Sequence, residues 1–159
     1  MSSEQQGSEP QVRRTEDVVV AAVREDVPMD QMPSFFDRAF HAAMDAVIRQ
    51  GLQATEPPVG IYFGMPDATV DVAAGFPVDA AFTDDGQVHR IVLPAARVAE
   101  VVHVGAYDAM ATTYQRLADW MEEQNLSPRE LMWETYETEP TPEGDPASMR
   151  TRITWLIAD

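Results

Sequence analysis

The 159-residue sequence contains no cysteine and no lysine. Without cysteine the chain forms no disulfide and has neither a thiol nucleophile nor a thiolate ligand for zinc. No apolar run approaches the roughly 18 residues that a membrane-spanning helix needs. The first residues, MSSEQQGSEPQ, are polar and acidic, which excludes an ordinary secretory signal. These absences are compatible with the cytoplasmic location that we expect, without membrane association.

Positive charge is also scarce, because 11 arginines face 27 acidic residues and the formal net charge is −16. Such a surface repels phosphate backbones, so we expect no direct binding to nucleic acid. Three interpretations of the acidity stay open: simple solubility, attraction for cationic small molecules, or mimicry of nucleic acid toward a basic partner. A hydrophobic content of 45% is ordinary for one globular domain.

Motifs for common cofactors are missing as well. The sequence shows no nucleophile elbow, phosphate-binding loop or dinucleotide fingerprint. The three histidines, His41, His89 and His103, lack the spacing of metal ligands. The acidic segment 137–145 lacks the spaced ligands and glycine of a calcium loop. We therefore expect neither a metal nor a cofactor.

Hydrophobic periodicity predicts an α+β domain over residues 16–159, preceded by a disordered acidic tail over 1–15. Two segments, 33–51 and 107–125, have apolar residues at helical spacing, and Ser34 with Asp37 predicts a capping box at the start of the first. Residues 87–94 and 97–105 are expected to pair as strands. The other expected strands are 17–23, 59–64, 70–78, 131–138 and 150–158.

The two halves of the domain match at an offset of 74 residues. The offset relates the helices, their ends at Gly51 and Asn125, and the strand residues Tyr62 and Tyr136. Farther on, Phe76 pairs best with Trp155. We therefore expect a duplicated β-α-β-β module, with repeats at about 17–82 and 87–158, two helices on one face of an antiparallel sheet, and a ligand cleft between the halves. Along the helices, the matched residues are Phe36 with Met110, Phe40 with Tyr114, Ala43 with Leu117, Met44 with Ala118, and Val47 with Met121.

The segment LMWETYETEP, residues 131–140, places a carboxylate inside an apolar strand. Because strand residues two apart share a face, Glu134 and Tyr136 point one way and Trp133 the other. Burying an unpartnered carboxylate costs several kcal/mol or forces protonation. Glu134 is therefore either exposed, paired with an arginine such as Arg152, or placed in a cleft. The offset of 74 sets Gly60 at the matching position of the first half, which would leave room opposite the carboxylate.

The second half resembles the gyrase-inhibitor-like (GyrI-like) effector-binding domain. The residues that carry the resemblance are VHVGAYDAMATTYQRLADWMEE, then WETYETEP, a short acidic loop, and a final strand beginning with threonine. The segment PPVGIYFGMPDATVDVAAGFPV is similar to the family's earlier strand pair, so the resemblance covers about residues 17–158. It implies a duplicated βαββ fold that binds amphipathic, often cationic drugs in a cleft, with a central glutamate that answers the ligand's charge.

The resemblance places that glutamate at Glu134 and the following tyrosine at Tyr136. Two departures stand out: Ala106 replaces the family's proline, and Thr154 stands where an aromatic wall is frequent. The family's domain is often fused to a DNA-binding domain, but only some 16 polar residues precede the first expected strand here, so we expect none. The expected ligand-binding residues are Glu134, Tyr136, Tyr62, Gly60, Tyr107, Met132 and Thr154.

Three functions stay open. The first is a bacterial domain of the multidrug-recognition type that binds a lipophilic or cationic small molecule for sensing, sequestration or resistance. The second is a hydrolase of electrophilic, cyclopropane-type compounds, in which Glu134 and Tyr136 are catalytic, with Glu134 as general base. The third is an acidic interaction protein that engages a regulator or a topoisomerase. A homodimer through an exposed sheet edge is also compatible with the sequence.

Overall fold

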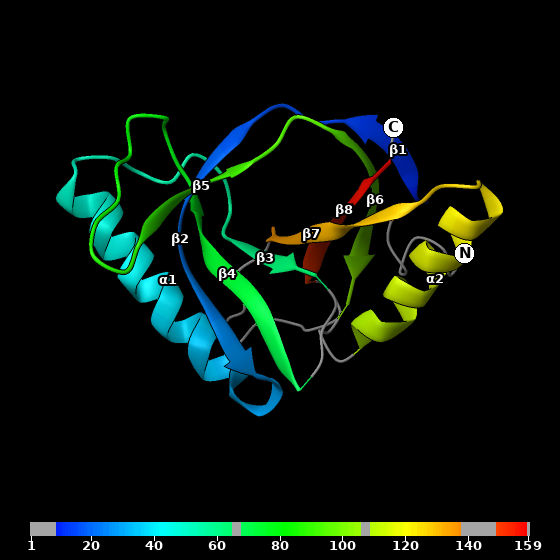
Figure 1. Cartoon of the computed structure of the whole chain (residues 1–159), viewed down its shortest axis with the longest axis horizontal. Coiled ribbons are helices and arrows are strands. Elements are labelled where there is room, and N and C mark those ends of the chain that lie inside the picture. The colour runs from blue at the N-terminus through cyan, green and yellow to red at the C-terminus, as the bar shows by residue number, and fades with distance from the viewer. Residues whose placement is uncertain (1–8, 65–67, 106–108, 138–148, 159) are drawn as a thin grey trace. The chain divides into compact units, whose positions relative to one another are not determined.

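The computed structural model describes residues 9–64, 68–105, 109–137 and 149–158. The chain divides into two compact units, one of residues 16–95 and one of residues 1–15 with 96–159. Each unit contains four antiparallel strands and one helix, so the expected α+β class is confirmed (Figure 1). Within the described part of the chain, neither helix has the length and hydrophobicity needed to cross a membrane.

The unit of residues 16–95 is built around strand β2 (Val18–Pro28). The strand order is β5-β2-β4-β3, with β3 at Val59–Phe63, β4 at Thr69–Pro77 and β5 at His89–Leu93. A 3-10 turn, η2 (Met29–Gln31), leads directly into helix α1 (Met32–Arg49), which lies along β2 and β4 (Figure 1). The helix approaches the sheet closely because its buried face is largely alanine: Ala39, Ala43 and Ala46.

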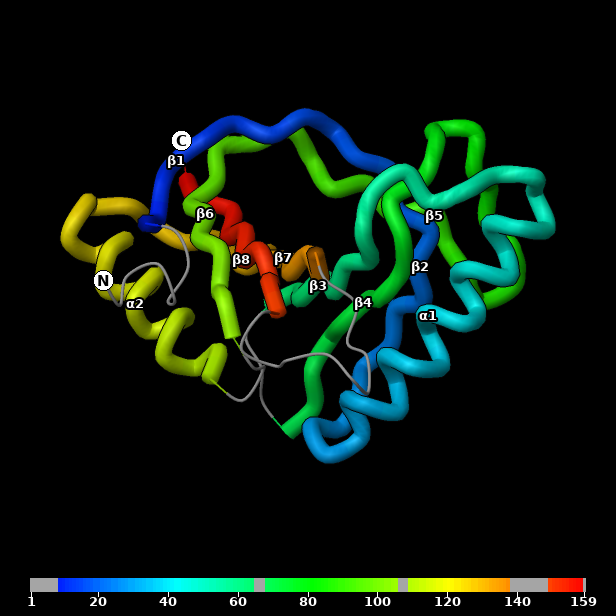
Figure 2. The backbone as a smooth tube through the Cα atoms, turned by 180° about the vertical axis from the view of Figure 1, so that it is seen from behind, coloured from blue at the N-terminus to red at the C-terminus, as the bar shows by residue number. Residues whose placement is uncertain are grey.

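The other unit is built around strand β6 (Arg97–Val104). Its strand order is β1-β6-β8-β7, with β1 at Gln11–Arg14, β7 at Pro128–Tyr136 and β8 at Arg150–Ile157. Helix α2 (Met110–Glu123) lies against β6. Figure 2 shows β1 beside β6, where Gln11 is opposite Glu100 and Arg14 is opposite Arg97.

The duplication is visible in matching hydrogen bonds and ring contacts. Both helices end at a residue with positive φ, Gly51 (φ 71°) and Asn125 (φ 59°), as expected. After each helix the same closing bond forms, from Leu52 N to Val47 O (3.0 Å) and from Leu126 N to Met121 O (2.8 Å). Each unit also contains one helix-to-strand aromatic pair: Phe40 with Phe76, at 5.6 Å between centroids, and Tyr114 with Trp155, at 6.5 Å.

The expected capping box at Ser34 is wrong. Because η2 runs into α1, the helix begins two residues earlier, and Gln31 occupies the N-cap. Ser34 then lies inside the first turn, where its hydroxyl donates to the carbonyl of Gln31 (3.1 Å). The buried face of α1 is also rotated from the expected one, since Phe35 is fully buried whereas Phe36 and Phe40 are partly buried.

Two further expectations on the strands are wrong. Residues 11–14 of the expected disordered tail form β1, because β6 offers them an edge to pair with. Residues 89–93 pair with β2 and not with β6, so the unit boundary falls at residue 95 and the second repeat begins later than expected. The carboxylate of Asp17 accepts the backbone N–H of Ala95 (2.6 Å) at this boundary.

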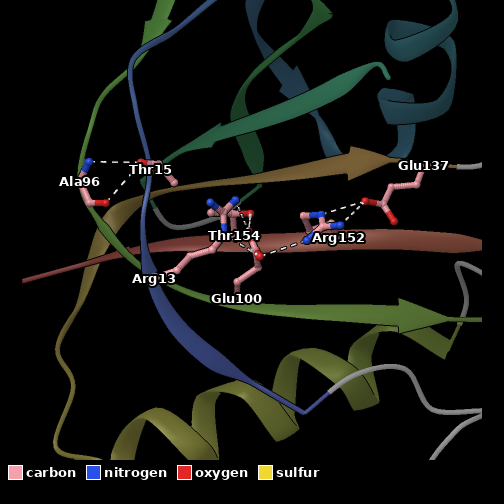
Figure 3. Close-up of polar contacts among 7 residues, drawn as sticks. All are labelled: Arg13, Thr15, Ala96, Glu100, Glu137, Arg152 and Thr154. Atoms are coloured by element: carbon pink, nitrogen blue, oxygen red, sulfur yellow. Dashed lines mark hydrogen bonds and ion pairs between the residues drawn. The ribbon is translucent and has the colours of Figure 1, made fainter. Parts of the chain in front are cut away.

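Strand β1 is fastened to its unit through a buried carboxylate. Glu100 is 1% exposed, and Arg13 donates to both of its oxygens at 2.8 Å (Figure 3). Arg152 (3.1 Å) and the hydroxyl of Thr154 (3.0 Å) donate to the same carboxylate. Burial alone raises the pKa of Glu100, but the hydrogen bonds and charge of Arg13, with the help of Thr154 and Arg152, outweigh it and hold that pKa below its usual value.

Replacing Arg13 by alanine is expected to lower the free energy of unfolding by about 1–3 kcal/mol near pH 7, since the partner carboxylate is buried. The half-exposed arginine and the remaining Arg152 keep the loss at the lower end. A carboxyl with a lowered pKa stabilises the fold above its unfolded pKa, and this stabilisation disappears as the pH falls through the folded pKa. The difference between wild type and variant should therefore shrink below pH about 4.5.

Urea unfolding followed by circular dichroism at several pH values measures this difference. Arg129→Ala is the matched control, because Arg129 is exposed on β7 and its loss changes the net charge by the same amount. Equal stability losses for the two variants, or a difference that is independent of pH, would contradict the role assigned to Arg13.

Candidate functional site

Glu134 lies on the face of the sheet that α2 covers, and it is 7% exposed. The alternation of β7 puts Met132, Glu134 and Tyr136 on this face and buried Trp133 on the other, as expected. The hydroxyl of Tyr136 donates to one oxygen of Glu134 at 2.7 Å, and the hydroxyl of Tyr114, from α2, donates to the other. A strand and a helix therefore position one buried carboxylate through two neutral phenol groups.

The surroundings of Glu134 are aromatic and apolar. Ile153 lies directly opposite Glu134 on β8 and belongs to the hydrophobic core of this unit. The ring of Tyr114 meets Trp155 edge to face, with an interplanar angle of 75°. Trp155 is itself fixed by a hydrogen bond from its indole N–H to the carbonyl of Arg129 (2.9 Å). Met132 adds a flexible thioether side chain to the same cluster.

The two buried carboxylates of this unit have different partners. Glu100 lies on the face opposite α2, where Arg13 and Arg152 neutralise it. Arg152 also pairs with Glu137 at 2.6 Å, so its proposed pairing with Glu134 is wrong. The reason is the register: Arg152 is opposite Thr135, and both point away from the face of Glu134. The Glu100 network is thus structural, whereas Glu134 lies among aromatic side chains.

The matched unit lacks the polar group. In β3, Gly60 and Tyr62 occupy the positions of Glu134 and Tyr136, and Tyr62 packs against the α1 core. In α1, Phe40 occupies the position of Tyr114 and carries no hydroxyl. The carboxylate and one of its two donors are therefore absent together from a unit of the same fold. The fold does not require this polar group, so its presence indicates a function.

The two helices also pack differently on their sheets. Helix α1 packs closely along both β2 and β4, whereas the described part of α2 packs closely along β6. The buried face of α2 carries the larger residues Met110, Leu117 and Met121 in place of alanines. These long side chains fill the space above β7 and β8, and methionines adapt readily to new neighbours.

A polar row crosses the same face beside Glu134. His103 on β6, Thr151 on β8 and Tyr136 on β7 are directly opposite one another. His103 and Thr151 are 3% and 0% exposed. The ring nitrogen Nδ1 of His103 and the hydroxyl of Thr113, on α2, are hydrogen-bonded at 2.6 Å. Among the described residues, no group of histidine and acidic side chains is arranged to hold a metal ion.

The expected site residues are distributed as follows. Glu134, Tyr136 and Met132 share one face of one unit, whereas Thr154 is on the opposite face, where it serves Glu100. Gly60 and Tyr62 belong to the other unit, and Tyr107 lies outside the described residues.

Tyr114 was missed as a site residue, because its spacing equally suits a core position. The signal was the offset of 74, which sets Tyr114 against Phe40 and so marks an added hydroxyl.

Comparison with known proteins agrees with this architecture. Residues 8–157 match the GyrI-like small molecule binding domain, so the chain belongs to that family. Among solved structures, the EcmrR C-terminal domain superposes with a TM-score of 0.78 at 20% identity, covering 94% of this chain and 97% of that one. In the EcmrR–DNA complex the matched protein is longer, and the chain spans 57% of it at 21% identity with a TM-score of 0.78. Among curated proteins no match was found.

A further structure shows a relative of this fold with a bound cation. SAV2435 bound to tetraphenylphosphonium has a TM-score of 0.67 at 13% identity and covers 95% of this chain and 94% of that one. A hydrolase from Listeria innocua has a TM-score of 0.65 at 13% identity, covering 99% and 98%. At these identities the likeness establishes the fold, and the ligand belongs to the relative.

Proposed function

We propose that this chain binds amphipathic aromatic cations against Glu134, beneath helix α2. The observation that carries the proposal is the buried carboxylate held by Tyr114 and Tyr136 within an aromatic cluster. Its absence from the matched unit, where Gly60 and Phe40 stand, supports a ligand-related role. Binding would serve sensing, sequestration or resistance.

The chemistry of the site suits a lipophilic cation. A buried carboxylate gains most from a counter-charge that carries little hydration of its own, because such a cation is cheap to desolvate. Each aromatic face next to the cation contributes a further 0.5–2 kcal/mol, roughly. Met132 and the methionines of α2 adapt to different ligand shapes. The tetraphenylphosphonium bound by SAV2435 is a cation of this class.

Other residues expected from the sequence remain proposals. Gly60 and Tyr62 are predicted to contact the ligand by virtue of their register with Glu134 and Tyr136. Thr154 is the weakest member, because its hydroxyl is engaged with Glu100.

A charged and a neutral ligand of similar shape test the proposal. Tetraphenylphosphonium is expected to bind at least about tenfold more tightly than triphenylphosphine oxide, since an interaction with a charged group contributes about 1.5–3 kcal/mol. Calorimetric titration at low and high salt separates the site from the acidic surface, because screening weakens adsorption to exposed charges far more than binding to a buried one. Equal affinities for the two compounds, or loss of tetraphenylphosphonium binding in salt, would contradict the proposal.

A hydrolase is the second candidate, favoured by the hydrogen bond between Glu134 and Tyr136. In that case Glu134 would take a proton from a water that attacks an electrophilic carbon, and a tyrosine hydroxyl would protonate or orient the leaving oxygen. Both candidates use the same carboxylate, so substituting Glu134 separates them, as the Discussion describes.

A further inference from the structure

Thr151 has an unusual environment for a hydroxyl group. It is 0% exposed, and its Oγ1 has no hydrogen-bond partner in the part of the chain that the structure describes. A buried polar group without a partner costs about 1–3 kcal/mol. Folding therefore gains nothing visible from this hydroxyl and is expected to lose stability because of it.

The matched unit shows that the fold accepts an apolar residue at this position. Thr151 is directly opposite Tyr136, and in the other unit Val72 is directly opposite Tyr62. Val72 is also 0% exposed, and valine has nearly the same shape as threonine. The hydroxyl of Thr151 is thus an addition to a position that valine fills, just as the carboxylate of Glu134 is an addition at the position of Gly60.

The hydroxyl lies beside the proposed cation site. Thr151 and Tyr136 are a directly opposed pair, whose Cβ atoms are about 4.5–5.5 Å apart in such sheets. Glu134 is diagonal to Thr151 across the same two strands, at about 7–8 Å. On the other side of Thr151, the ring of His103 is held by Thr113. An unused hydroxyl therefore stands one strand away from the carboxylate, on the same face and under the same helix.

We propose that Thr151 is a specificity-determining residue that hydrogen-bonds a polar group of the ligand. The inference rests on the proposed function and narrows its ligand class to amphipathic cations that carry a hydroxyl, ether or carbonyl oxygen. This oxygen lies about 5–8 Å from the cationic centre, the range set by the spacing of Thr151 from Tyr136 and Glu134. A wholly apolar cation such as tetraphenylphosphonium binds at Glu134 without using Thr151.

Two phosphonium compounds of nearly equal size test this inference. In (3-hydroxypropyl)triphenylphosphonium a hydroxyl takes the place of the terminal methyl of butyltriphenylphosphonium. The wild-type chain is expected to prefer the hydroxyl compound, relative to their water–octanol partition, and Thr151→Val is expected to weaken that compound alone by about 3–10-fold. Thr151→Val should unfold at an equal or higher urea concentration than wild type, because it removes an unpartnered buried hydroxyl.

Two variants serve as controls. Thr135→Val makes the same chemical change on β7, on the face opposite Glu134, and is expected to leave both affinities unchanged. Glu134→Gln is expected to weaken both compounds together.

The inference is overturned if Thr151→Val leaves the ratio of the two affinities at its wild-type value, weakens both compounds equally, or destabilises the unliganded chain. Each of these results leaves the cation site at Glu134 standing if Glu134→Gln still weakens both compounds. If Glu134→Gln weakens neither while Thr151→Val removes the preference, the proposed role of Glu134 fails and that of Thr151 stands. If wild type binds neither compound, both proposals fail.

Discussion

Glu134→Gln is expected to weaken the binding of tetraphenylphosphonium about 10–100-fold. Glutamine keeps the size of the side chain and can still accept from the hydroxyls of Tyr114 and Tyr136, but it carries no charge. The loss therefore reports the interaction between a buried carboxylate and a cation, with little change in shape. Fluorescence of the nearby Trp155 or calorimetric titration measures the affinity.

Glu130→Gln is the matched control for this substitution. Glu130 lies on the same strand, β7, but is exposed, so its loss lowers the acidic charge of the chain by the same amount. The control is expected to change the affinity less than about twofold, since exposed charges are strongly screened. Similar losses for the two variants would show that general acidity attracts the cation, and the site at Glu134 would be wrong.

The same variant separates binding from hydrolysis. For a pure binder, Glu134→Gln lowers affinity, and the ligand is recovered unchanged from wild type. For a hydrolase with Glu134 as general base, an electrophilic substrate is consumed by wild type, whereas the variant binds it and turns over at least about a hundredfold more slowly. If glutamine alters neither affinity nor turnover, both accounts of Glu134 are wrong.

The largest expected effect on stability is that of Gly75→Ala, at about 3 kcal/mol or more. Gly75 lies within β4, between Ala22 of β2 and Val59 of β3. A Cβ atom there would lie 1.9 Å from the backbone oxygen of Ala21 and 2.7 Å from Cα of Ala22. Both obstacles are backbone atoms, so the methyl group fits only if β2 and β4 separate and lose hydrogen bonds.

Gly51→Ala is the companion variant for Gly75→Ala. A Cβ at Gly51 meets nothing within 4 Å, but its φ of +71° disfavours alanine by about 1–2 kcal/mol. Urea unfolding of the two variants then compares a steric clash with a conformational penalty. A cost for Gly75→Ala no greater than that for Gly51→Ala would show that β2 and β4 can separate readily.

Much of the site followed from the periodicity of the chain. Alternation in β7 puts Glu134 with Tyr136 and against Trp133, whatever the rest of the fold does. The offset of 74 residues set these positions against Gly60 and Tyr62, because a duplicated module keeps its register. The same offset contained Tyr114 opposite Phe40, but a tyrosine at helical spacing is as compatible with a core as with a site.

Contacts between distant segments could not be predicted in this way. Arg13 meets Glu100 across 87 residues of sequence, because β1 adds to the edge of β6. A polar segment such as QVRR resembles a disordered tail until a partner edge is known. The pairing of β5 with β2 depends in the same way on an edge supplied by another part of the chain.

The sequence alone thus specified the duplicated α+β module, its helices with their left-handed ends, and the face on which Glu134 lies. Each of these follows from local periodicity and from the conformational preferences of a few residues. The folded chain was needed for the donors to Glu134, for the arginines that neutralise Glu100, and for the unpartnered hydroxyl of Thr151. A hydrogen bond depends on positions within a few tenths of an ångström, which strand register and helix packing set and which no pattern along one segment contains.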